Sequence, residues 1–251
     1  MPARNEEGCI VTTLQRFTEV LGRSGIPYEI VVVDDGSTDA TADRLGALSA
    51  LHPEIVPVSN AGRHGFGMAV RYGLARATGD AVAIVMADGS DSPEDTILYY
   101  RKLQEGYDCV FGSRFIRGGR VIDYPRHKLI LNRMANAFIR ILFGLSFNDT
   151  TNAFKCYRRE VIEGMQPLIS PHFNLTVEMP LKAMIRGYSF AAVPITWTNR
   201  AAGLSKLKIK EMGSRYLFIV LYLWLEKHLS LGDYYRAKAA APAERAPKVN
   251  V

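Results

Sequence analysis

Two pairs of carboxylates follow apolar runs in this sequence. Asp34 and Asp35 come directly after the run IVVV, and Asp88 and Asp91 come after the run AIVM. In an open α/β sheet, ligands bind beyond the carboxyl ends of the strands. Carboxylates at that edge can accept hydrogen bonds from sugar hydroxyls or ring N–H groups, and they can bind hard cations. They can equally form turns or cap helices, so a ligand site and a set of acidic turns are both open interpretations.

The segments that must position these residues alternate between strand and helix patterns over the first two-thirds of the chain. Strands are predicted in the stretches YEIVVV, EIVPVS, DAVAIVMAD and DCVFGSR, with Pro57 placing the second one near a sheet edge. Helices are predicted over 40–51 and 66–77, and the sequence SPED from Ser92 is typical of a helix start. This alternation predicts an α/β domain with a mostly parallel sheet.

The last third has a different pattern. Helices are predicted over 128–143 and 174–186, followed by the strand SFAAVPITW and the basic loop NRAAGLSKLKIK. The run YLFIVLYLWL is about 15 Å long as a helix, half the thickness of a bilayer core, so we expect it not to span a membrane. We predict a catalytic-type domain over 1–208, an amphipathic helix over 209–235 and a disordered Ala/Pro-rich tail over 236–251.

The composition is that of a globular protein with an anionic partner. The 31 Lys and Arg against 25 Asp and Glu give a net charge of +6, which favours a phosphorylated ligand or an anionic membrane, or reflects a basic solvated surface. No recognition motif supports a nucleic-acid partner. Three cysteines without a CxxC pair favour a reducing compartment, and the first residues lack the apolar core of a signal peptide. We therefore expect a cytoplasmic protein, at the inner face of the membrane if it binds lipid.

Seven motifs in order identify a resemblance. They are PARNEE, YEIVVVDDGSTDAT, GLARATGD, MADGSDSPE, FGSRF, DTTNAFKCYRREV and NRAAGLSKL. Together they cover about residues 2–228 and resemble glycosyltransferase family 2, most of all its dolichyl- or polyprenyl-phosphate mannose or glucose synthases. The resemblance implies the GT-A fold, a Rossmann-like, mostly parallel sheet flanked by helices, here with a C-terminal amphipathic helix.

The resemblance also implies a reaction and a set of site residues. A hexose would pass, with inversion, from a GDP-mannose or UDP-glucose type donor to a polyprenyl phosphate, with Mg²⁺ or Mn²⁺ neutralising the diphosphate. Asp88, Asp91, Arg114 and Glu178 are the candidates for catalysis. The residues expected to border the nucleotide sugar are Pro2, Arg4, Glu6, Val33, Asp35, Met86, Ala87, Asp88, Arg114, Arg200 and Lys206.

Two departures from the family pattern bear on the site. Met86 stands where the family has the first carboxylate of Asp-x-Asp, so the metal ligands are predicted to be Asp88, Asp91 and, more weakly, Ser90. A degenerate site that binds a nucleotide sugar without turnover is the alternative. Only Met1 precedes Pro2, where the family has an apolar strand. We therefore expect the sheet to lack its first strand and the nucleotide site to lack a wall.

The acceptor is the least determined part of the prediction. Arg117 and Arg120, followed by a basic cluster over 126–128, are predicted to receive an acceptor phosphate, and two apolar helices edged with Arg and Lys predict peripheral membrane contact. The alternative acceptor is a hydroxyl group, with Glu178 as general base. The sequence does not determine the donor base, the donor sugar or the oligomeric state.

Overall fold

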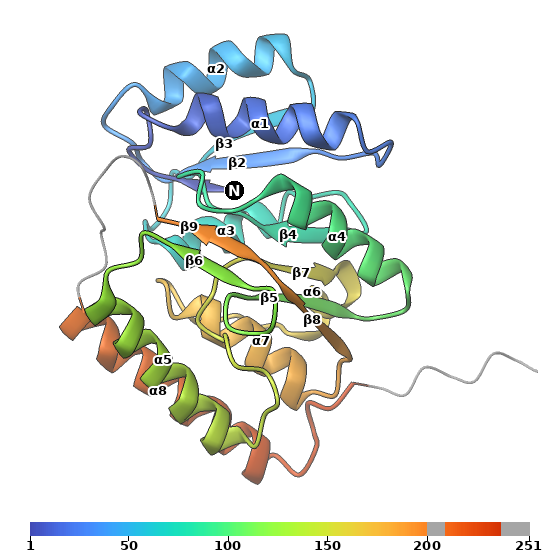
Figure 1. Ribbon diagram of the computed structural model, residues 1–251, viewed down its shortest axis with the longest axis vertical. Coiled ribbons are helices and arrows are strands. Elements are labelled where there is room, and N and C mark those ends of the chain that lie inside the picture. Colours follow the sequence, from blue (N-terminus) through green and yellow to red (C-terminus); the bar gives the residue numbers. More distant parts are fainter. Residues whose placement is uncertain (200–208, 237–251) are drawn as a thin grey trace, which may run out of the picture.

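The structure is a computed structural model that describes residues 1–199 and 209–236. Figure 1 shows layers of strands with helices on either side, α1 and α2 at one end and α5 and α8 side by side at the other. The described residues form eight helices: α1 (Ile10–Gly22), α2 (Thr41–Leu51), α3 (Phe66–Leu74), α4 (Pro93–Gln104), α5 (Arg126–Phe143), α6 (Arg159–Gly164), α7 (Leu175–Ile185) and α8 (Ile209–Leu229).

The strands of the described residues form three sheets. The first has the order β1 (Pro2–Ala3), β2 (Ile30–Asp34), β3 (Ile55–Ser59), and the second has the order β4 (Ala81–Ile84), β7 (Lys155–Arg158), β5 (Cys109–Ser113), β8 (Phe190–Pro194); the third pairs β6 (Arg120–Ile122) with β9 (Thr196–Thr198). Only the pairs of β7 with β4 and β5 are antiparallel. The prediction of a mostly parallel α/β fold is confirmed.

Local patterns located most elements within a few residues. Pro57 lies in β3 at the edge of its sheet, as predicted. Helix α4 begins at Pro93, but the Ser92 side chain bonds to the Glu94 carboxylate instead of capping a backbone N–H. The sequence analysis missed β7, because a strand of four residues inside the motif FKCYRR has no clear alternation.

The prediction of a missing first strand is borne out in part, because only the two-residue strand β1 occupies this place in the described residues. Pro2 and Ala3 pair in parallel with Val33 and Asp34, and the Met1 amino group donates to the carbonyl of Val31 at 2.8 Å. Between this strand and β4 lies a cavity of about 200 Å³, lined mainly by apolar side chains. At the end of β1 the Asp35 N–H donates to the carbonyl of Ala3 at 2.8 Å, and among the described strands β1 does not pair with β4.

Helix α8 is anchored to the rest of the chain by apolar packing and by a buried ion pair. Its residues Ile219, Val220 and Leu223 pack with side chains of α5 and α7 in one core cluster. Arg186, after α7, forms a two-point ion pair with Glu226 of α8, with Nε–Oε1 at 2.8 Å and Nη2–Oε2 at 3.2 Å. None of the helices in the described ranges is both long enough and apolar enough to cross a bilayer.

The buried ion pair gives a test of this anchoring. Glu226→Ala leaves the Arg186 guanidinium, whose side chain is 4% exposed, without its carboxylate. We expect the free energy of unfolding to fall by about 3–5 kcal/mol, as for other buried pairs that lose one partner. Urea denaturation measures it. Glu19→Ala, which breaks the exposed pair with Arg23, is the matched control and should cost less than about 1 kcal/mol. Equal effects would contradict the anchoring role.

Candidate active site

The first acidic position, Asp35, is buried beneath a loop that follows β3. Its Oδ2 accepts from the Gly65 N–H at 2.8 Å, and its Oδ1 accepts from Asn60 Nδ2 at 2.7 Å and contacts His64 Nδ1 at 3.2 Å. The Arg4 guanidinium lies 4.0 Å away. The sequence analysis missed Asn60 and His64. Their position in the chain could have indicated them, because β3 is parallel to β2 and Asn60 follows the carboxyl end of β3. Ligands in such sheets bind beyond the carboxyl ends of the strands.

The N-terminal residues predicted for the nucleotide meet Asp35 at the same edge. Pro2 pairs with Val33 across β1 and β2, and the loop after β1 lies on the loop after β2. The Glu6 N–H donates to Thr41 Oγ1 at 2.9 Å, and the Asn5 N–H donates to Ser37 Oγ at 2.9 Å. Residues from two separate motifs thus form one surface beside the Asp35 carboxylate.

The second acidic position is a tight turn that contains all three predicted metal ligands. Asp88, Ser90 and Asp91 are buried, and Gly89 between them has φ +73°, a left-handed conformation that glycine adopts without strain. Asp91 folds back so that its Oδ2 accepts from the Met86 N–H at 2.9 Å, while Asp88 Oδ1 accepts from the Ser90 N–H at 3.1 Å. A carboxylate therefore lies beside the backbone of Met86, although residue 86 itself has none.

The electrostatics of this turn favour a cation. Burial raises the pKa of Asp91 to about 7, and the nearby Asp88 and Asp95 act in the same direction. The described residues contain no group of three or more His, Cys, Asp or Glu arranged to hold a metal. Mg²⁺ and similar hard cations need only one or two carboxylates when substrate phosphates and waters complete the shell. Asp88, Asp91 and Ser90 fit that donor set.

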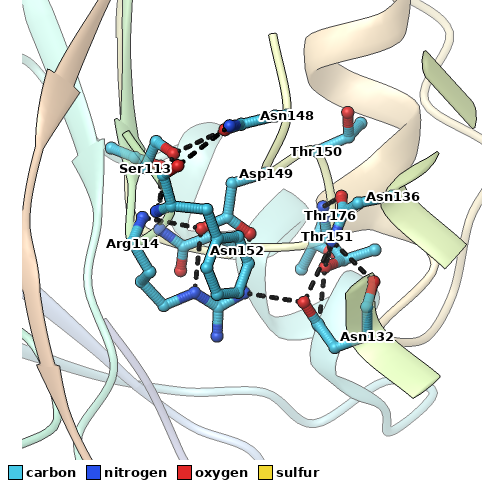
Figure 2. A network of polar contacts seen from close by, with 12 residues as sticks. Ser113, Arg114, Asn132, Asn136, Asn148, Asp149, Thr150, Thr151, Asn152 and Thr176 are labelled. Carbon is cyan, nitrogen blue, oxygen red and sulfur yellow. Dashed lines mark hydrogen bonds and ion pairs between the residues drawn. The ribbon is translucent and has the colours of Figure 1, made fainter. Parts of the chain in front are cut away.

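Arg114, at the end of β5, is held by a buried carboxylate. Its Nε and Nη2 donate to the two oxygens of Asp149 at 2.8 and 2.7 Å, and its backbone N–H donates to Oδ2 at 2.9 Å (Figure 2). Burial acts to lower the pKa of the guanidinium, but Asp149 outweighs it and raises that pKa. The sequence analysis missed Asp149, although it begins the motif DTTNAF. Arg114 remains a predicted phosphate contact, with part of its charge already paired.

Aromatic rings join Arg114 to the acidic turn that contains Asp88, Ser90 and Asp91. The rings of Phe115, Tyr124 and Trp197 lie 5.1, 5.9 and 5.8 Å from the Arg114 guanidinium carbon. Trp197 is in β9, and the next residue, Thr198, donates its N–H to the carbonyl of Ser90 at 3.4 Å. The guanidinium and the carboxylates therefore border one region, in which negative phosphates would meet both a cation site and an arginine.

Glu178 does not fit the predicted role of general base. It is fully buried in α7; its Oε1 accepts from the Ile169 N–H and pairs with Lys182 at 2.8 Å, and its Oε2 accepts from the Ser170 N–H at 2.7 Å. Both oxygens are thus used to hold the preceding loop, which gives Glu178 a structural role. Arg117 and Arg120 are exposed between β5 and α5, whereas Arg200 and Lys206 lie outside the described residues.

Residues 1–165 match the model of the family described as Glycosyl transferase family 2. The chain belongs to this family. The polyprenol monophosphomannose synthase of Mycolicibacterium smegmatis is 35% identical over 186 residues, 71% of this chain and 69% of that protein. The dolichol-phosphate mannosyltransferase of Pyrococcus furiosus is 32% identical over 216 residues, 84% of this chain and 59% of that protein.

A solved structure confirms the fold of this family 2 chain. Glucosyl-3-phosphoglycerate synthase from Mycobacterium tuberculosis, in complex with Mn²⁺ and uridine-diphosphate-glucose, matches with a TM-score of 0.65. The match covers 90% of this chain and 76% of that chain at 21% identity. At this identity the likeness supports the GT-A fold and leaves the substrate to the site itself.

The raised pKa of Asp91 predicts a pH-dependent stability. The folded-state pKa near 7 exceeds the usual 3.8, so the folded protein binds the extra proton and loses relative stability as pH rises from about 4 to 7. Asp91→Asn removes the titrating charge and keeps an oxygen for the Met86 N–H. In EDTA, we expect Asp91→Asn to raise Tm at pH 8 relative to wild type. At pH 4 the two Tm values should converge. A difference that does not change with pH would contradict this assignment.

Proposed function

We propose that this chain transfers a hexose, with inversion, from a nucleotide-diphosphate sugar of the GDP-mannose or UDP-glucose type to a polyprenyl phosphate. The reaction would take place at the cytoplasmic face of a membrane and would require Mg²⁺ or Mn²⁺. Family membership and the names of the two curated relatives support a lipid-phosphate acceptor. The observation that carries the proposal is a large apolar surface on α5 and α8.

This α5/α8 apolar face consists of exposed side chains spaced mostly three or four residues apart, which places them along one side of each helix. They are Ile130, Leu131, Met134, Phe138 and Ile141 of α5, and Leu217, Phe218, Leu221, Leu225 and Leu229 of α8. The two helices lie side by side (Figure 1). Water-exposed apolar patches of this extent mark binding surfaces for membranes or partners.

The charges on the same helices favour an anionic lipid surface as the occupant. Helix α5 carries Arg126, Lys128, Arg133 and Arg140 and contains no Asp or Glu. Between Gly213 and Leu229 the one acidic residue is Glu226, which is buried against Arg186. Basic residues beside an apolar stripe are attracted by the negative surface potential of the cytoplasmic leaflet. This arrangement also accounts for part of the net positive charge.

In the proposed reaction, the residues at the sheet edge have separate roles. Pro2, Arg4, Glu6, Val33 and Asp35 bind the nucleoside. Asp88 and Asp91, with Ser90, hold the cation, which neutralises the leaving diphosphate when bound. Arg114 adds positive charge that needs no proton transfer, and Met86 and Ala87 line the donor. Arg200 and Lys206 are proposed to contact the donor phosphates from the segment after β9.

The acceptor phosphate needs no general base, because a phosphate monoester with a second pKa near 6 is already mostly ionised at neutral pH. Its oxygen attacks the anomeric carbon from the face opposite the leaving diphosphate. Arg117 and Arg120, which lie between β5 and α5, bind the acceptor phosphate. A hydroxyl acceptor would require a base, and the candidate Glu178 has both oxygens occupied.

Transfer assays test the proposal. With short polyprenyl phosphates and a panel of GDP- and UDP-sugars, we expect product with Mn²⁺ or Mg²⁺, and none with EDTA. Asp88→Asn should reduce the rate by about 100-fold or more, because it removes a ligand of the charge-neutralising cation. Product is measured as sugar label in the lipid phase.

Two outcomes would contradict the proposed function. Transfer to a hydroxyl compound in place of the lipid phosphate would identify the alternative acceptor. Tight nucleotide binding without turnover for any donor and acceptor would identify a nucleotide-sugar binding protein. Glu94→Gln is the control. It removes an exposed carboxylate at the start of α4, close to the acidic turn, and should transfer the sugar at the wild-type rate.

The membrane contact has its own test. Ile141 is 79% exposed, so Ile141→Asp should not disturb folding. It places a charge in the α5/α8 apolar face, and we expect binding to vesicles that contain anionic lipid to weaken about tenfold, the equivalent of one buried apolar side chain. Cosedimentation measures binding. Leu51→Asp, at a position 76% exposed on α2, is the matched control and should bind like wild type.

A further inference from the structure

Helix α5 has two different faces, and it is held weakly by the rest of the chain. Of its eighteen residues only Asn136, Ile139 and Phe143 are buried. Ile139 and Phe143 pack with α7 and α8 in the C-terminal half of the helix. In the N-terminal half, Asn132 hydrogen-bonds to the domain and the Arg133 guanidinium lies over the ring of Phe115. Few buried apolar contacts are the property of elements that open or shift at low cost.

The inward face of α5 bonds to the loop that holds Arg114. Asn132 Nδ2 and Asn136 Nδ2 each donate to Thr151 Oγ1 at 2.9 Å, and the Thr151 N–H donates to Asn136 Oδ1 at 3.1 Å. Asn132 Oδ1 also faces Arg114 Nη2 at 3.5 Å. Figure 2 shows these side chains meeting between the helix and the loop. Two asparagines one helical turn apart therefore contact both Arg114 and the loop of its carboxylate, Asp149.

A second set of contacts joins the same loop to α8. Lys155, which is buried, donates through Nζ to the carbonyl of Thr150 at 2.9 Å and to that of Thr176 at 3.3 Å. The Tyr216 hydroxyl of α8 donates to the carbonyl of Phe173 at 3.1 Å and lies 3.5 Å from Thr176 Oγ1. The loop after Asp149 is thus bonded directly to α5 and is linked to α8 only indirectly, through Lys155 and Thr176.

We infer that contact between the α5/α8 apolar face and a lipid surface positions Arg114 for transfer, through Asn132 and Asn136. The inference rests on the proposed function and adds regulation to it: the enzyme is faster at a membrane even with an acceptor that is soluble in water. Asn132 and Asn136 are positioning residues, because they act on Arg114 and its loop and not on the substrate.

The physical reason is the difference between the apolar outer face and the polar inner face of α5. Transfer of the apolar side chains on its outer face from water into lipid is favourable. Their insertion restricts the motion of a helix that has few buried apolar contacts. A lipid surface can shift the helix only because it binds the conformation in which α5 holds the loop better than it binds the looser one. Insertion of the outer face of α5 into lipid holds both asparagines against Thr151, and it thereby fixes Asp149 and the guanidinium of Arg114.

Intrinsic fluorescence supplies a reporter that does not depend on turnover. The chain has two tryptophans, Trp197 and Trp224, and Trp197 lies 5.8 Å from the Arg114 guanidinium. In a Trp224→Phe background, Trp197 is the single tryptophan. The experiment adds phosphatidylcholine/phosphatidylglycerol vesicles that contain no acceptor, after cosedimentation has established that this variant binds them. Trp197 emission is recorded, together with transfer to geranyl phosphate as a soluble acceptor.

With the asparagines intact, we expect vesicles to change Trp197 emission and to raise the transfer rate several-fold. In Asn132→Ala/Asn136→Ala, both responses should be lost while cosedimentation with vesicles is retained. Gln15→Ala, which removes an exposed amide from α1, should respond like the parent. If the double variant fails to fold, Asn132→Ala, at a half-buried position, provides the same comparison.

Three results would overturn the inference: retained stimulation and emission change in the folded asparagine variant, vesicle binding by the parent with neither response, or no vesicle binding at all. Failure of the proposed function is distinguishable. If no donor and acceptor give product, the chain is not the proposed transferase, and Trp197 emission alone then decides whether lipid contact reaches Arg114.

Discussion

The buried ion pair of Arg114 and Asp149 is the interaction on which the rest of the site depends. Asp149 is fully buried and Arg114 nearly so, and they approach with two parallel hydrogen bonds and a third from the backbone. A charge left alone in such a place is costly, so each residue fixes the other. The pair thereby orders the loop over 148–152, whose remaining polar groups bond to β5, α5 and Lys155 of β7.

The ordering of that loop connects two parts of the molecule with opposite character. On one side lie the buried carboxylates of the acidic turn, where Asp91 occupies the space beside the Met86 backbone. On the other side lie two helices with apolar outer faces and basic neighbours. A reaction between a water-soluble nucleotide sugar and a lipid phosphate needs both environments within one substrate length. The loop over 148–152 contacts Arg114 on one side and Asn132 and Asn136 of α5 on the other.

The same arrangement separates residues of similar type into different roles. Asp91 and Glu178 are both buried carboxylates, but two backbone N–H groups and Lys182 use both oxygens of Glu178. Asp91 bonds to one backbone N–H, and burial raises its pKa to about 7. A carboxylate with few compensating partners gains from a cation, whereas one that is already compensated does not. The surroundings of each acid decide its role, more than its place in a motif.

The sequence by itself determined the alternation of strands and helices, the strand ends that carry Asp35, Asp88 and Asp91, and the family. These follow from local patterns and from the rule that parallel strands end on one edge. Only the tertiary structure decided that Arg114 pairs with Asp149, 35 residues away, that Asn60 and His64 meet Asp35, and that Glu178 is enclosed. It also revealed β1, a strand of two residues that carries no pattern. The reason is physical: partners of a buried polar group are chosen by packing between distant segments, and no local periodicity encodes that choice.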